Sequence, residues 1–593
     1  MHQLKQLHRF HIPVMGIGFT LETPLKVAKY GIDSVVSIVD DQILETLRSV
    51  WAKRYQKSFV AIPESEADAR AKRITAYLNF LDERVREEFD QLLHEDFDRC
   101  EALHQYFRLL PDDNEMAVWY KQFLPANTTE REVLAAKLKA GMRCGSIDVN
   151  IMTKIDGNRQ HPDKPEASDA LAALRGFALS HLHASVIFSA GMNPALYSYC
   201  THFDDFFPDA NGYTKKKIIL KVSDYRSAMI QGKWLAKKGL WVHEFRIESG
   251  INCGGHAFVS QGKLLGPILE EFKQQRNELD QILRKEYKAA WEQKQRIVAD
   301  PLPSRITAQG GIGTAEEQQF LLHYYQLDAV GWGSPFLLVP EATTVDGQTR
   351  YQLAHSKPDD FYLSNASPLG VPFHNFKPST SQALRKERIQ KERPGSPCYK
   401  EFLAFNTDYN HKALCTGSRM YQKLKIAELN VSMVDPELRE AAIRQITEKE
   451  CLCEGLSASV WLHHQTPHPH KLKAVSICPG PNLAWFHGTF SLQQMCDHIY
   501  GRTNLLDKRH RPNLLMNELQ LYLNYCKDQM GRESSSTQKP MDDSMIRNLI
   551  SGMAYYEQLC EDVQWAYPAM FATTRSELKT ISAEAESLLL HEQ

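Results

Sequence analysis

The stretch RITAQGGIGTAEEQQFLLHYYQLDAVGWGSPFLLVPEA, residues 305–342, is the most informative part of this chain. It predicts a short apolar strand at 306–308, a glycine-rich turn, a helix at about 315–325, a second strand at 329–330 and another glycine-rich turn. Glycine lets the backbone approach a ligand closely, and bare N–H groups at a helix N-terminus can hold a phosphate dianion. The alternative is two ordinary strand-to-helix turns. The residues expected to hold a phosphate are Gly310, Gly311, Gly313, Gly333 and Ser334.

The number of predicted strands indicates the fold class. A dinucleotide fingerprint fits residues 305–342 poorly because the G-x-G-x-x-G spacing is lacking, whereas two glycine turns after consecutive strands are typical of the phosphate site of a TIM barrel. Six further strands are expected at 13–19, 34–39, 146–152, 185–190, 217–222 and 241–247. Eight strands close a barrel, and no edge-strand pattern supports an open doubly wound sheet. We therefore predict an α/β protein with a TIM (β/α)8 barrel.

The domain organisation follows from shifts in pattern. The barrel is expected at 1–355, with a charged helical insertion at about 42–140 after the second strand. Residues 356–397 are rich in proline, serine, lysine and arginine, and predict a linker or a covering segment. Residues 398–593 predict a mainly helical, cysteine-containing C-terminal domain, whose apolar residues at helical spacing indicate a core or a subunit interface.

Composition excludes several classes of function. The chain has 70 basic and 72 acidic residues among 593, so electrostatics offers no case for binding nucleic acid or an anionic membrane surface. No apolar run reaches membrane-spanning length, and the first residues, MHQLKQLHRFHIP, lack a hydrophobic signal core. We therefore expect a cytoplasmic protein with reduced cysteines that acts on a small molecule.

Polar residues and glycines gather where the predicted strands end. Gly16 follows the first strand, Asn150 lies in the third, Lys221 is near the end of the fifth, and the sixth leads into the loop 248–256. Active sites of TIM barrels lie at the carboxyl ends of the strands. The agreement among several strands predicts one site at that end of the barrel.

Two motifs resemble a known family. Cys253-Gly254-Gly255-His256 resembles the alanine-glycine-glycine-histidine loop of the nitronate monooxygenases, formerly 2-nitropropane dioxygenases, which are FMN-dependent TIM barrels. The stretches AQGGIGTAEE and LDAVGWGSPFLLVPEA are similar to the family's phosphate-binding end, and MGIGF falls where the family has its first flavin-contacting loop. The resemblance covers roughly residues 10–50 and 141–345.

The resemblance implies an FMN-dependent oxidoreductase that oxidises a small carbon acid. His256 is expected to be the general base, because an imidazole with a pKa near neutrality can take a proton from a carbon beside the flavin. Lys221 is expected to place positive charge near the reduced flavin or a substrate anion; the alternative is a lysine that reaches solvent. The residues expected to bind the cofactor, besides the phosphate-binding set, are Gly16, Asn150, Lys221, Ser249, Gly254 and Gly255.

This chain also departs from the family pattern. It has Asn252 and Cys253 where the family has glutamate and alanine, Ser249 where the family has a flavin-binding glutamine, and Phe258 where a glycine is usual. These positions surround the reactive edge of the flavin. The resemblance therefore supports the cofactor more strongly than an alkyl nitronate substrate.

The C-terminal part raises the question of a metal. Thiolates in number can bind zinc or an iron–sulfur cluster, and a cluster beside a flavin would form an electron path. The alternative is cysteines buried as small apolar residues. The histidines of HHQTPHPH, 463–470, could join a metal site or lie in a solvated loop. The candidate cysteine ligands are Cys398, Cys415, Cys451, Cys453 and Cys478.

Two other functions remain open from the sequence. One is a flavin-dependent reductase or dehydrogenase, similar to an enoyl reductase, to which the C-terminal domain delivers electrons. The other is a non-catalytic barrel that binds a phosphate or nucleotide. The sequence also leaves open the substrate, oxygen or a pyridine nucleotide as the redox partner, an electron-transfer partner, and a homo-oligomeric state.

Overall fold

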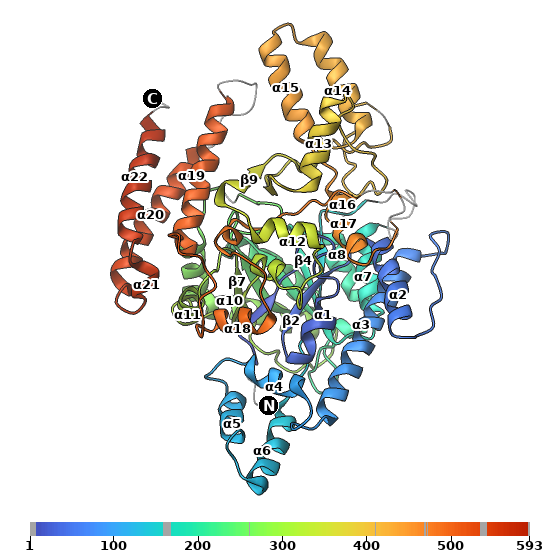
Figure 1. Ribbon diagram of the computed structural model, residues 1–593, viewed down its shortest axis with the longest axis vertical. Coiled ribbons are helices and arrows are strands. Elements are labelled where there is room, and N and C mark those ends of the chain that lie inside the picture. The colour runs from blue at the N-terminus through green and yellow to red at the C-terminus, as the bar shows by residue number, and fades with distance from the viewer. Residues whose placement is uncertain are drawn as a thin grey trace.

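A computed structural model describes residues 7–157, 168–259, 261–409, 411–467, 470, 473–533 and 543–590. Its centre is a closed barrel of eight parallel strands in chain order, in which β1 pairs with both β2 and β8 (Figure 1). This confirms the predicted TIM barrel. The strands are β1 (Phe10–Ile12), β2 (Asp33–Ser37), β3 (Ile147–Met152), β4 (Ala184–Ser189), β5 (Lys216–Val222), β6 (Val242–Glu248), β7 (Arg305–Gln309) and β8 (Ala329–Gly331).

The first strand differs from the prediction. It was expected at 13–19, but β1 ends at Ile12, and the apolar stretch PVMGIGF forms the loop that follows. Proline has no N–H to donate to a ladder, and Gly16 takes a left-handed φ of 53° that a strand does not allow. The loop instead pairs with the C-terminal part of the chain, since the N–H of Gly18 donates to the carbonyl oxygen of Leu456 at 3.1 Å. The other seven strands lie within two residues of their predicted bounds.

Helices surround the barrel and extend from one end. The long α3 packs against α2 and α7, while α4, α5 and α6 form a projection at the bottom of Figure 1. The helices up to β8 are α1 (Thr23–Val27), α2 (Asp41–Arg54), α3 (Ala69–His94), α4 (Glu101–Arg108), α5 (Glu115–Phe123), α6 (Thr128–Gly141), α7 (Asp169–Ala178), α8 (Pro194–Tyr199), α9 (Tyr225–Ala236), α10 (Leu265–Gln293) and α11 (Ala315–His323).

The segment after the barrel returns to the carboxyl ends of the strands. Residues 356–397, predicted as a linker or a cover, contain an antiparallel hairpin of β9 (Phe361–Ser364) and β10 (Phe373–Phe376), and then α13 (Thr380–Gln390). The hairpin lies on the loop after β6, because the N–H of His374 donates to the carbonyl oxygen of Gly255 at 2.9 Å. This contact fixes one wall of the site described below.

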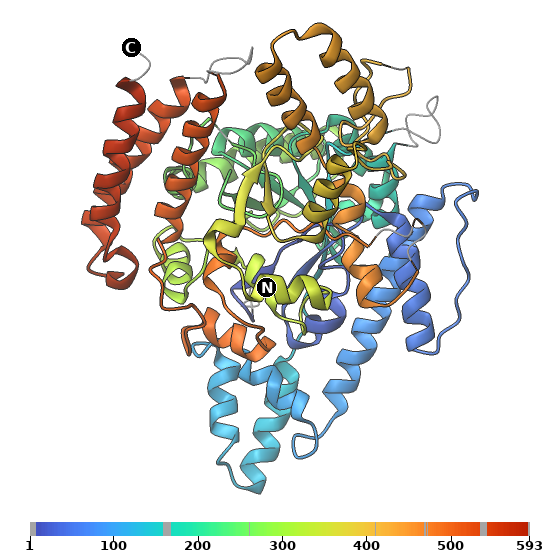
Figure 2. The same ribbon diagram turned by 45° about the horizontal axis from the view of Figure 1, so that its top comes forward.

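The remaining helices form two groups (Figure 2). Helices α14 and α15 stand out from the body, and α19, α20 and α22 lie side by side along one flank. Buried residues of α19 and α20 belong to the same apolar core as the barrel strands, so this flank is packed on the barrel. No helix in the described ranges is both long and apolar enough to cross a bilayer. The helices are α12 (Gly347–Ala354), α14 (Arg419–Ser432), α15 (Pro436–Glu448), α16 (Leu452–Gly455), α17 (Ala458–His463), α18 (Leu492–Ile499), α19 (Leu514–Glu533), α20 (Asp543–Val563), α21 (Pro568–Phe571) and α22 (Thr574–Leu590).

Candidate active site

A cavity of about 220 Å³ lies at the carboxyl ends of the barrel strands. The structure brings most of the predicted site residues to its wall, although they come from six different strand ends and loops. The predicted residues that line it are Gly16, Asn150, Lys221, Gly254, Gly255, His256, Gly310, Gly311, Gly333 and Ser334. Gly313 and Ser249 do not line it.

The ends of β7 and β8 present unpaired amides to this cavity. The N–H groups of Gly311, Ile312 and Gly333 have no hydrogen-bond partner within the described ranges, and all three residues line the cavity wall. Gly311 has a left-handed φ of 75°, and a Cβ there would lie 2.0 Å from Nδ2 of Asn252. Only glycine fits this position without displacing its neighbour. The arrangement is suited to an anion with several oxygen atoms.

Gly313 was predicted to bind the same phosphate, but its amide is already used. It donates to Oε2 of Glu317 at 2.8 Å, and the same oxygen accepts the N–H of Thr314 at 3.1 Å. Thr314 in turn caps α11 by accepting the N–H of Glu317, which completes a reciprocal capping box. The side chain of Arg511 covers Gly313 from the other side. The cap at the start of α11 therefore removes Gly313 from the anion site.

Ser249 was predicted to bind the cofactor, but it faces the flanking helices instead. Its hydroxyl donates to Glu518 of α19 and accepts the N–H of Asn252 at 2.9 Å, and the residue is only 3% exposed. Asn252 continues the contact by donating to the carbonyl oxygen of Leu514 at 3.0 Å. The loop after β6 thus uses its polar side chains to bind α19, a contact between residues more than 260 positions apart in the chain.

Three side chains at neighbouring strand ends form a charged network in the cavity wall. Nζ of Lys221 lies 2.7 Å from Oε2 and 2.9 Å from Oε1 of Glu248, and Nε2 of Gln309 donates to Oε1 of the same carboxylate at 2.6 Å. The other amide atom, Oε1 of Gln309, is buried without a partner among the described residues. Sequence reasoning missed Gln309; its position as the last residue of β7, before Gly310, was the available signal. Nε2 of His11 is likewise buried without a partner among the described residues, and Gln309 acts on the pKa of this ring, so the two groups can satisfy each other.

His256 lies in the same cavity and is held by the hairpin. Its Nε2 is 2.7 Å from Oγ of Ser367, and its ring packs edge-on against Phe373 with the centroids 5.0 Å apart. Burial lowers the pKa of His256 to about 4, and the positive charges of Lys154 and Lys221 act in the same direction. The expectation of an imidazole with a pKa near neutrality is therefore wrong, because the chain encloses the ring among apolar groups and cations. The ring is neutral at pH 7.

The roof of the cavity comes from the C-terminal part of the chain. Apart from Asn482 and Gly480, its residues are apolar or cysteine, and they lie in the loop 398–405, in α16 and its C-cap, and in the segment 477–482. The N–H of Gly255 donates to the carbonyl oxygen of Cys478 at 3.1 Å, which joins the roof to the glycine pair before His256. Sequence analysis did not predict this roof. Its residues are Phe402, Leu403, Leu452, Cys453, Leu456, Ile477 and Cys478.

Four of the five candidate cysteine ligands, Cys398, Cys415, Cys451 and Cys453, lie together in a small apolar cluster beside the cavity. Cys453 and the fifth, Cys478, line the cavity itself. Burial raises the pKa of the thiols of Cys451 and Cys478 to about 12, so both are protonated. Among the described residues no three cysteines lie within ligand distance of one another. The structure brings four predicted ligands into one cluster but does not show a zinc or iron–sulfur site made of these thiols.

Comparisons with known proteins add little at the level of sequence. No protein-family model matches the chain, and no curated protein matches it. Among solved structures, the chain is similar to FabK from Thermotoga maritima, with 13% identity and a TM-score of 0.32 over 64% of this chain and 83% of that one. It is also similar to the enoyl reductase domain of MlnA from the macrolactin biosynthesis cluster of Bacillus amyloliquefaciens, with 17% identity and a TM-score of 0.31 over 69% and 88%.

A third solved structure is a nitroalkane oxidase from Streptomyces ansochromogenes, with 11% identity and a TM-score of 0.29 over 64% of this chain and 86% of that one. Similarity this low carries no argument about the activity of this chain. Its fold rests on the observed strand pairing, and its function rests on the geometry of its own cavity.

Proposed function

We propose that this protein is an FMN-dependent oxidoreductase that resembles the nitronate monooxygenases and acts on a small carbon acid. The observation that carries the proposal is the set of unpaired amides at Gly311, Ile312 and Gly333, in one cavity with His256 and Lys221. An anion site made of backbone N–H groups at the last two strand ends is the place where TIM barrels hold a phosphate. The motifs around these residues carry the resemblance to the family.

The residues present fit FMN. The three amides and the hydroxyl of Ser334 would hold the phosphate. Asn150 and Lys221 would lie beside the ring. When bound, FMN supplies a reversible acceptor for two electrons.

The residues of the chain handle the proton and exclude water. His256 is neutral at pH 7, so its imidazole can accept a proton from the substrate without first losing one. An imidazole with a pKa of about 4 is a weak base, and it therefore suits a carbon acid that is strongly activated by a neighbouring group. The apolar roof, with Phe402 and Leu403, separates this step from bulk water.

The reductase alternative keeps the same cavity but changes the direction of electron flow. An enclosed apolar roof is equally suited to the reduction of an activated double bond. Cys398, Cys415, Cys451 and Cys453 are the group that would deliver electrons in this alternative, although among the described residues no three of their sulfur atoms lie within 4.8 Å of one another. Oxygen consumption with a nitroalkane, measured against NADH oxidation with an activated alkene, distinguishes the two activities.

The cofactor proposal is tested by placing a negative charge at the anion site. In Gly333→Asp the new Cβ approaches only Cγ of Pro13, at 3.3 Å, so the backbone can tolerate the side chain. A carboxylate about 4 Å from the phosphate repels it by roughly 4 kcal/mol at an effective dielectric constant of about 20, which weakens FMN binding by about 1,000-fold. Riboflavin, which lacks the phosphate, should bind this variant almost as well as the wild type.

The matched control is Gly347→Asp. Gly347 begins α12, and its added Cβ would meet no atom within 4 Å. Quenching of flavin fluorescence gives the dissociation constants of FMN and riboflavin for all three proteins. The cofactor proposal is refuted if the wild type neither contains FMN nor binds it, and that result would leave the non-catalytic phosphate- or nucleotide-binding module. Equal losses of riboflavin and FMN in Gly333→Asp would refute the placement of the phosphate.

A further inference from the structure

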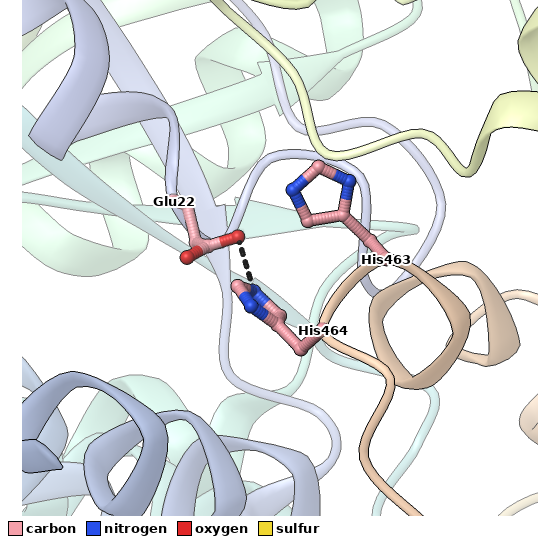
Figure 3. Close-up of side chains that lie close together, drawn as sticks. All are labelled: Glu22, His463 and His464. Atoms are coloured by element: carbon pink, nitrogen blue, oxygen red, sulfur yellow. Dashed lines mark hydrogen bonds and ion pairs between the residues drawn. The ribbon is translucent and has the colours of Figure 1, made fainter. Parts of the chain in front are cut away.

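A second group of polar side chains lies outside the cavity, where the barrel meets the C-terminal part of the chain (Figure 3). Glu22 is the residue before α1, and His463 and His464 end α17. One ligand atom from each of the three residues lies within 4.8 Å of the other two. In the described part of the chain this is the only group of three or more histidine, cysteine or acidic side chains that meets this condition.

The carboxylate of Glu22 is buried and held in place. It is 3% exposed, and its Oε1 accepts the indole N–H of Trp51 at 2.8 Å. Its Oε2 accepts the hydroxyl of Thr344 at 2.7 Å and lies 2.8 Å from Nε2 of His464. Metal-binding carboxylates are oriented by outer hydrogen-bond donors of this kind.

The two histidines complete a set of one oxygen and two nitrogen ligands. Their rings are nearly perpendicular, at 85°, with centroids 5.0 Å apart. His463 is exposed, which opens a path from solvent to the site. Two imidazoles and one carboxylate, with a fourth position open to water, are a ligand set that zinc accepts.

Positive charges near the site oppose a cation and limit its affinity. Lys26 lies close enough to act on both Glu22 and His463, and Arg350 acts on His463. Nζ of Lys26 is directed to the carbonyl oxygens of Pro340 and Thr343, at 3.1 and 2.7 Å. Burial lowers the pKa of this lysine to about 8, so its charge is lost more readily than that of an exposed lysine. The opposition therefore weakens as the pH rises toward and beyond 8.

We propose that Glu22, His463 and His464 bind one divalent cation of the zinc class, which fastens the roof of the cavity to the barrel. The histidines end α17, which follows α16, and the C-cap of α16, Leu456, lines the cavity and accepts the N–H of Gly18. A metal that bridges Glu22 and α17 would hold this roof segment on the loop after β1. The inference does not depend on the identity of the cofactor in the cavity.

The test uses the full chain, freed of metal with a chelator and titrated with Zn²⁺ against a chromophoric competitor at pH 7.5. We expect one zinc ion per chain and an increase in thermal stability on binding, because a ligand that binds only the folded state stabilises it. His463→Ala removes an exposed ligand and leaves the bond between Glu22 and His464 in place, so this variant should fold. Its affinity for zinc should fall at least about tenfold, the lower end of the effect expected when a metal site loses a supporting group.

The matched control is His355→Ala, which removes an exposed histidine bonded only to the carbonyl oxygen of Tyr351 within the described structure. It should bind zinc like the wild type. The inference is overturned if the wild type binds no zinc at micromolar concentrations, if His463→Ala binds it as tightly as the wild type, or if both variants lose affinity equally. FMN affinity, measured separately, should change little in either variant, so failure here is distinct from failure of the proposed cofactor.

Discussion

Glu518 joins α19 to the barrel, and its replacement by glutamine should make the protein more stable above pH 7. The carboxylate is 1% exposed and accepts hydrogen bonds from the hydroxyl of Ser249, the N–H of Leu265 at 2.7 Å and the hydroxyl of Tyr556 at 3.5 Å. Burial raises the pKa of Glu518 from 4.5 to about 7, and these hydrogen bonds only partly oppose the rise. A glutamine can keep the same contacts by turning its carbonyl to Leu265 and its NH₂ to Ser249.

The sign of the pH dependence follows from the raised pKa. Between about pH 4.5 and 7 the folded protein keeps a proton on Glu518 that the unfolded chain has lost, so stability falls as the pH rises through this range. Above pH 7 both states are ionised and the loss is complete. At 1.36 kcal/mol per pKa unit, the full loss is about 3 kcal/mol. Glutamine carries no charge at any pH and avoids this loss.

The assay is urea denaturation of the wild type and Glu518→Gln at intervals between pH 5 and 8.5. The difference in free energy of unfolding between the two proteins should move in favour of the variant by about 3 kcal/mol across this range and level off above pH 7. Glu586→Gln, which removes an exposed carboxyl from α22, is the control and should show no such change. A difference between Glu518→Gln and the wild type that stays constant with pH would refute the reasoning.

Three further predictions concern the cavity. Gly311→Ala should lose FMN. It should also lower the free energy of unfolding by more than the roughly 1–2 kcal/mol that left-handed backbone strain costs, because the new Cβ meets Asn252. The control is Gly370→Ala, which has a φ of 74° and no atom within 4 Å of its Cβ, and which should show the strain alone in the same urea assay. Lys221→Met should destabilise the protein by about 1–3 kcal/mol, because the partly buried Glu248 loses the ammonium group that neutralises it and keeps only the hydrogen bond from Gln309. If Lys221 contacts the flavin ring, adding Glu248→Gln should restore stability but not flavin affinity. Restoration of both would show that Lys221 has a structural role only. Because the pKa of His256 is about 4, this residue should not titrate between pH 6 and 8. The pH profiles of turnover in the wild type and in His256→Ala should therefore have the same shape in this range. A change of turnover between pH 6 and 8 that occurs in the wild type and is lost in His256→Ala would contradict the enclosure of the ring.

The amino-acid sequence by itself determined the barrel and the location of its site. Local signals were sufficient for most strands, since these are short apolar runs followed by glycine or polar residues, and parallel strands place all such ends on one face. The exception is β1, which is followed by the apolar stretch Pro13-Val14-Met15 and was predicted too late in the chain. The motif Gly254-Gly255-His256 and the turns at 310–311 and 333–334 therefore met in one cavity as predicted. The capping box of Thr314 and Glu317 and its consequence for the amide of Gly313 were found only in the structure.

The tertiary structure alone decided which of these groups are available to a ligand. Gly311 and Gly313 look alike in sequence. In the structure Glu317 accepts the amide of Gly313 and Arg511 covers this residue, whereas the amide of Gly311 has no partner among the described residues. Whether a backbone N–H is free depends on the side chain that docks behind it, and that side chain can come from anywhere in the chain. His464 reaches Glu22 across 442 positions. Contacts at such separations result from packing of the C-terminal helices on the barrel, and neither periodicity nor spacing in the sequence records them.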